Sequence, residues 1–104
     1  MAGRRHDHSE AAVNRAYYAA RAVLYRVGES PRSNKGVRAR FGDHFVRTGR
    51  VDQATASTLQ VAEVARLKAD YDAFSAFDAA AVRDLIRDVE RFVAVVEALL
   101  AEGD

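Results

Sequence analysis

Apolar residues between positions 82 and 100 recur at helical spacing, and this regularity constrains the fold more than any other feature of the chain. On an α-helix they fall within one sector of roughly 120°, the width of a single buried face. The members of this stripe are Val82, Leu85, Ile86, Val89, Phe92, Val93, Val96, Leu99 and Leu100. The opposite face alternates in charge through Arg83, Asp84, Arg87, Asp88 and Arg91. The pattern predicts a structural helix with a solvated outer face, begun by Asp78 as N-cap with Phe77 packed on Val82.

Three more helices are predicted from their end signals. The first starts near Asp7 or Ser9, runs to about Val27 and stops at Gly28. The second is capped by Ser33 or Asn34 and ends at Gly49, with one shared face made of Val37, Phe41, His44, Phe45 and Thr48. The third is capped by Asp52 and reaches Tyr71, with a stripe made of Ala54, Val61, Val64, Ala65 and Tyr71.

The length and composition agree with a single all-helical domain over residues 1–104. The chain has one proline and six glycines, and no run rich in valine, isoleucine and threonine alternates as a strand would. Short connections between long helices favour antiparallel neighbours. We therefore predict an all-α fold, an up-and-down antiparallel four-helix bundle.

The adjacent tyrosines of the first helix must face different surroundings, because neighbouring helical residues lie about 100° apart. Tyr17 lies in line with the apolar residues Val13, Ala16, Ala20, Leu24 and Val27. Tyr18 lies with Tyr25 on the other side, among Asn14, Arg15, Arg21 and Arg26. One face is predicted to be core. The other is a contact surface, for which we favour a protein interface over single-stranded RNA, which also stacks on such rings.

Charge and cysteine content narrow the classes of function. Residues 1–50 hold 11 Lys/Arg against 4 Asp/Glu, whereas residues 51–104 hold 5 against 11. The basic first half suits an acidic partner, nucleic acid included, and Lys35, Arg38 and Arg40 add charge near the start of the second helix. The chain lacks cysteine, a membrane-spanning apolar run and a signal peptide, so we expect a cytoplasmic protein without membrane contact. His6 and His8 lack further ligands, so we expect no metal and no cofactor.

Three short segments, taken in order, resemble the HEPN family, the higher eukaryote and prokaryote nucleotide-binding helical domains. The first is the Ala12–Ala20 segment, which contains the paired tyrosines. The second begins with Ser33-Asn34-Lys35-Gly36-Val37 and continues through Phe41, Phe45 and the Arg47-Thr48-Gly49 end. The third is Arg66 followed by Ala69-Asp70-Tyr71. Related chains usually carry another amphipathic helix before the paired tyrosines, so we expect that helix to be missing or very short here.

The resemblance implies a helical bundle that usually forms a homodimer, often encoded beside a minimal nucleotidyltransferase as toxin and antitoxin or as a two-part transferase. We expect RNA or nucleotide binding in a toxin–antitoxin-type or nucleotidyltransferase-associated module. The candidates for binding or interface contacts are Arg15, Tyr18, Arg21, Tyr25, Asn34 and Lys35. A purely structural role beside a nucleotidyltransferase is an alternative.

Ribonuclease members of this family use an arginine followed a few residues later by histidine, without metal. After Arg66 the corresponding positions hold Tyr71, Asp72 and Ala73, so the motif histidine is absent. The catalytic candidates are therefore Arg66, Asp70 and Tyr71, and whether the protein is an enzyme stays open. Arg66 and Asp70 also fit an exposed helical ion pair.

Tyr71 and His44 each have a structural interpretation beside the catalytic one. Tyr71 fits a core ring with its hydroxyl at the edge, because it lies in the apolar stripe of its helix. His44 fits a hydrogen-bonded interior histidine better than a catalytic base, because it shares a face with Val37 and Phe41.

Overall fold

The computed structural model describes residues 2–71 and 79–102, and it places side chains for residues 10–65 and 80–102. The elements are α1 (Ala2–Arg26), α2 (Asn34–Phe41), the π-helical turn η1 (Gly42–Val46), α3 (Gln53–Ala56), α4 (Thr58–Tyr71) and α5 (Ala79–Glu102). The described residues contain no strand, so the predicted all-α bundle is confirmed. None of the described helices is both long enough and apolar enough to cross a bilayer.

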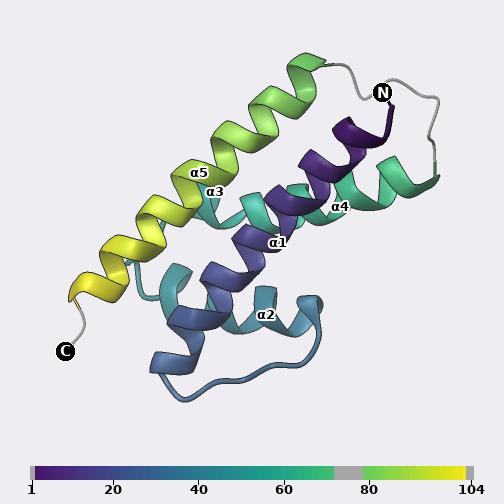
Figure 1. Cartoon of the computed structure of the whole chain (residues 1–104). Coiled ribbons are helices and arrows are strands. Elements are labelled where there is room, and N and C mark those ends of the chain that lie inside the picture. The colour runs from purple at the N-terminus through teal and green to yellow at the C-terminus, as the bar shows by residue number, and fades with distance from the viewer. Residues whose placement is uncertain (1, 72–78, 103–104) are drawn as a thin grey trace.

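Helix α1 is the centre of the bundle and packs against α5, α4 and α2 (Figure 1). It begins at Ala2 rather than near Asp7 or Ser9, because the cost of Asp or Ser inside a helix is only a few tenths of a kcal/mol and does not stop it. Its predicted inner face is confirmed by the buried residues Val13, Ala16, Tyr17, Ala20 and Leu24. Val27, predicted to belong to that face, is 41% exposed because the helix has already ended at Arg26.

The two longest helices run in the same direction (Figure 1). Arg26, the last residue of α1, donates from Nη1 to the carbonyl oxygen of Leu100 near the end of α5, at 3.0 Å. Alternating directions would have made the first and last helices of the bundle antiparallel. They are parallel here, and the short elements α2, η1 and α3 and the 14-residue helix α4 lie between them in the chain.

Helix α5 carries the stripe that the sequence predicts. Val82, Leu85, Val89, Phe92, Val96 and Leu99 are buried, and Ile86, Val93 and Leu100 are half-buried against the core. Arg83, Asp84, Arg87 and Arg91 on the opposite face are exposed, and Arg87 pairs with Asp84 at 3.0 Å. The predicted cap by Asp78 and Phe77 lies outside the described residues.

The predicted second helix is confirmed in position but contains a π-helical turn. Ser33 is its N-cap and accepts a hydrogen bond from the backbone N–H of Gly36, and the chain leaves the helix at Gly49 with φ +82°. Phe41 and Phe45 are buried and pack tilted against each other, with ring centroids 5.0 Å apart. The π turn changes the angular spacing of the residues after Phe41, so Thr48 is exposed although the sequence predicts it on the buried face.

The predicted third helix is broken into two, and its predicted buried face is wrong. Asp52 caps α3 by accepting from the Thr55 backbone N–H at 2.8 Å, but the helix is interrupted at Ser57 before α4 begins. Ser57 keeps helical dihedral angles, φ −63° and ψ −16°, and the wrong face arises within α4 itself. The buried side chains of α4 are Thr58, Leu59, Ala62 and Ala65. Of the predicted stripe, Ala65 is buried, Ala54, Val61 and Val64 are exposed, and the Tyr71 side chain lies outside the described part.

Candidate functional site

Tyr18 and Tyr25 project from the side of α1 that faces away from the core. Their side chains are 74% and 75% exposed, which is unusual for rings of this size in a folded domain. Tyr17, one residue earlier, is only 4% exposed. The division of the two adjacent tyrosines between core and surface is therefore confirmed.

The segment after α1 folds back beside Tyr18 and Tyr25 and is held there by Arg21. One guanidinium nitrogen donates to the carbonyl oxygen of Pro31 at 2.6 Å, and the other donates to Asn34 Oδ1 at 3.1 Å. Asn34 in turn donates from Nδ2 to Glu63 Oε1 on α4, at 3.0 Å. Arg21 and Asn34, both predicted as binding residues, thus join α1, the connecting segment, the start of α2 and α4.

A shallow hollow of about 590 Å³ lies between the two exposed tyrosines and this segment. Its lining residues are Tyr18, Arg21, Ala22, Tyr25, Glu29, Ser30, Pro31 and Arg32. Most of the lining is apolar because the tyrosine rings, the Ala22 methyl group and the Pro31 ring form it. We call this site the Tyr18–Tyr25 surface; the sequence predicted the rings but not the wall opposite them.

Basic residues dominate the chain around this surface. From Asn14 to Lys35 the sequence has five basic residues and a single acidic one, Glu29. Arg15, Arg32 and Lys35 are exposed, and Lys35 lies in the first turn of α2. Arg32 lines the hollow and Arg15 lies about one turn before Tyr18 on α1, so these two exposed residues give the apolar rings a positively charged rim.

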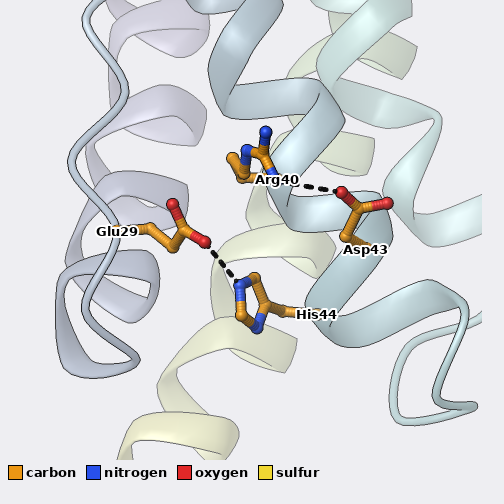
Figure 2. A network of polar contacts seen from close by, with 4 residues as sticks. All are labelled: Glu29, Arg40, Asp43 and His44. Atoms are coloured by element: carbon orange, nitrogen blue, oxygen red, sulfur yellow. Dashed lines mark hydrogen bonds and ion pairs between the residues drawn. The ribbon is translucent and has the colours of Figure 1, made fainter.

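The Glu29 carboxylate contacts a histidine of η1, as Figure 2 shows. His44 Nε2 lies 2.9 Å from Glu29 Oε2, and the two side chains are 33% and 30% exposed. Nearby in the chain, Arg40 of α2 pairs with Asp43 of η1 at 3.3 Å (Figure 2). His44 is hydrogen-bonded, as predicted, although it is half-buried at the edge of the core. Its contact fixes the first residue of the wall of the hollow.

A second polar group lies inside the bundle, where α1 meets α2 and α4. The Tyr17 hydroxyl donates to the carbonyl oxygen of Leu59 at 3.0 Å and accepts from Arg38 Nη1 at 2.9 Å. Arg38 therefore supports the interior contact of α1 with α4, although the sequence analysis counted it with the basic residues that suit an acidic partner. Residues 17, 38 and 59 are too far apart in the sequence for helical periodicity to pair them.

The predicted catalytic residues lie together on the last part of α4. Arg66, Asp70 and Tyr71 belong to this helix by their backbone, but their side chains lie outside the described part, as do those of His6 and His8. Among the side chains that the structure places, no group of three or more His, Cys, Asp or Glu could hold a metal ion.

The fold and this surface can now be compared with known proteins. The model of the HEPN domain family matches residues 4–99, nearly the whole chain. The chain belongs to the HEPN family. A UPF0332 protein of Thermotoga maritima is 31% identical to it over 102 residues, which cover 94% of this chain and 77% of that protein. No solved structure matches this HEPN chain. The family resemblance drawn from the three sequence segments is confirmed.

Proposed function

We propose that this HEPN-family chain is a subunit of a protein complex and that another protein subunit covers its Tyr18–Tyr25 surface. The observation that carries the proposal is the exposure of two tyrosine rings beside a mostly apolar hollow on a helix that is otherwise central to the core. Tyrosine and arginine are the residue types enriched where protein interfaces are strongest. A second copy of the chain and a minimal nucleotidyltransferase, both expected from the family resemblance, are the candidate subunits.

Within such a complex we propose that the chain contributes RNA or nucleotide binding, in a toxin–antitoxin-type or nucleotidyltransferase-associated module. The support is the excess of basic over acidic residues in the first half of the chain, 11 against 4 in residues 1–50, with Lys35 exposed in the first turn of α2. Single-stranded RNA is bound elsewhere by basic grooves that follow its backbone. Binding should weaken steeply as salt is raised, because phosphate contacts release counterions.

The subunit role is tested by the mass of the protein in solution, alone and after co-expression with the candidate nucleotidyltransferase. The variant Tyr18→Ser/Tyr25→Ser should lose the association and keep its helical circular dichroism. The matched control is Arg83→Ser/Arg91→Ser on the exposed face of α5, which should associate as the wild type does. A wild-type protein that stays monomeric with and without the second protein would contradict the proposal.

The catalytic alternative, a metal-independent ribonuclease, is tested separately. Arg66→Ala should abolish RNA cleavage that persists in EDTA, and Asp70→Asn and Tyr71→Phe should show which side chain moves the proton. A purified assembly that binds RNA and does not cut it would leave the binding role alone.

A further inference from the structure

We propose that the Tyr18–Tyr25 surface receives an acidic amphipathic helix of a partner protein. An aliphatic side chain of that helix sits in the hollow between the two rings, and its carboxylates pair with Arg15 and Arg32. This inference names the kind of partner for the proposed function and rests on it.

The spacing of the exposed residues on α1 is that of a helix–helix seam. Tyr18, Ala22 and Tyr25 follow one another at positions i, i+4 and i+7, so they lie on one face over two turns, roughly 10 Å along the axis. Ala11 extends the same face by two further turns and is also exposed. The small side chain of Ala22 lets another backbone approach closely, and the rings on either side form the hole that a side chain of the partner would fill.

The wall of the hollow is already in place before any partner arrives. Arg21 holds the carbonyl group of Pro31 at 2.6 Å, and His44 holds Glu29 at 2.9 Å, so both ends of the segment are attached to helices. Binding then orders few additional groups, and a preformed hollow loses less conformational entropy than a flexible one.

The positive charge around the hollow favours a negatively charged partner. The acceptors of Arg21 are the carbonyl oxygens of Pro31 and Arg32 and the amide oxygen of Asn34; no carboxylate of a described residue pairs with this guanidinium. Glu29, the single acidic residue that lines the hollow, accepts from His44. The rim therefore stays positive, and complementary carboxylates on the partner speed encounter and exclude basic competitors.

A protein helix fits this surface better than RNA does. Arg21 lies at the centre of the site, but its guanidinium is engaged with backbone and amide oxygens and is not available to grip a phosphate. Four of the eight residues that line the hollow, Tyr18, Ala22, Tyr25 and Pro31, offer apolar area to an aliphatic side chain.

The experiment uses the full chain and three synthetic helical peptides, each labelled for fluorescence anisotropy. The first carries leucine at i, i+4 and i+7 flanked by glutamate, the second has lysine in place of each glutamate, and the third has serine in place of each leucine. The glutamate–leucine peptide should bind at least about tenfold more tightly than either of the others. Equal or tighter binding of the lysine peptide would overturn the proposal.

Variants of the chain locate the peptide. Tyr18→Ser/Tyr25→Ser should weaken binding of the glutamate–leucine peptide about tenfold or more. Arg15→Glu/Arg32→Glu should reverse the preference in favour of the lysine peptide. The control Arg83→Glu/Arg91→Glu, with the same charge change on the exposed face of α5, should bind as the wild type does. If that control changes the binding as much as the rim variant does, only net charge is being measured and the proposal is wrong.

Two further outcomes separate this proposal from the subunit role. If no peptide binds but Tyr18→Ser/Tyr25→Ser still dissociates the complex, the partner is not an acidic helix and the subunit role stands. If a single-stranded oligouridylate displaces the bound peptide and its binding is lost in the tyrosine variant, the surface belongs to RNA and the helix proposal is overturned.

Discussion

Tyr17 and Tyr18 are adjacent in the chain, and their hydroxyl groups have different surroundings. The Tyr17 hydroxyl is buried between Arg38 and the Leu59 carbonyl group, whereas Tyr18 projects into solvent. A buried polar group stabilises the fold only while its partners are in place. The same chemical change should therefore have different consequences at the two positions.

Tyr17→Phe should lower the free energy of unfolding by about 1–2 kcal/mol, because the Leu59 carbonyl oxygen loses its side-chain donor and Arg38 Nη1 loses the Tyr17 oxygen as acceptor. Tyr18→Phe is the matched control and should change it by less than about 0.5 kcal/mol. Urea denaturation followed by circular dichroism measures both. Equal effects at the two positions would show that the hydroxyl of Tyr17 contributes nothing to the contact of α1 with α4.

The stabilisation that Asp52 gives as the N-cap of α3 depends on pH. Two hydrogen bonds from Thr55 lower the pKa of the Asp52 carboxyl below its ordinary value of 3.8. The one from the Thr55 side chain has the larger effect, and the one from its backbone N–H the smaller. A lowered pKa in the folded state means that the cap stabilises the chain above the unfolded pKa, and that this contribution is lost as the pH falls through the folded value.

We expect Asp52→Asn to keep the helix start, since asparagine is also a good N-cap, and to remove this part of the acid sensitivity. A pH titration of the Asp52 carboxyl resonance by NMR, combined with unfolding of both proteins between neutral and acid pH, measures it. An Asp52 resonance that titrates at or above 3.8 would contradict the assignment of the cap.

At the scale of elements, the buried face of α4 differs from the one that the sequence predicts, and substitutions can test which is buried. Leu59 is 1% exposed and Val61 is 54% exposed, although the sequence stripe had placed Val61 in the core. Leu59→Ala should destabilise the chain by about 2–5 kcal/mol, through lost burial and the cavity that remains. Val61→Ala, two residues away on the same helix, should cost less than about 0.5 kcal/mol in the free chain.

Chemical denaturation of the two α4 variants gives the comparison directly. A large loss for Val61→Ala in the free chain would mean that this side chain is covered in solution. A large loss that depends on protein concentration would assign that cover to a second copy.

How well each element could be predicted follows from how regular its residue pattern is. The stripe of α5 is long and strictly periodic, so burial at Val89, Phe92 and Val96 followed from spacing alone. In α4 the buried side carries Leu59 with the small residues Ala62 and Ala65, whereas Val61 and Val64 are exposed, so hydrophobicity alone selects the wrong side of this helix. The π-helical turn η1 changes the spacing of the residues after Phe41, and an extra residue per turn leaves no signature in composition.

The candidate site was predictable in part for the same reason. The exposure of Tyr18 and Tyr25 follows from the helical angle between neighbours. The ties from Arg21 to Pro31 and from Asn34 to Glu63 connect residues 10 and 29 positions apart, where periodicity carries no information. The family was predictable because three segments carry its motifs in order, although none of them says where a loop will fold.

At the scale of the whole molecule, a partner that covers the Tyr18–Tyr25 surface should raise the thermal stability of the chain. A subunit that binds only the folded chain raises its unfolding free energy by about 2.7 kcal/mol when present at 100 times its dissociation constant. Thermal unfolding of the wild type should therefore shift upward as the partner is added. Tyr18→Ser/Tyr25→Ser should melt near the wild-type temperature when alone and should not respond to the partner. A shift of the same size in both proteins would mean that the partner binds elsewhere.

The bridge from Arg21 through Asn34 to Glu63 also links recognition to the completion of folding. Arg21 of α1 holds one wall of the hollow through Pro31. The Asn34 amide that accepts from Arg21 donates in turn to Glu63 on α4. A nascent or partly unravelled chain in which α4 has not docked lacks this anchor and presents two tyrosines on a bare helix. A subunit that binds this surface, as proposed, would thereby discriminate mature copies from immature ones.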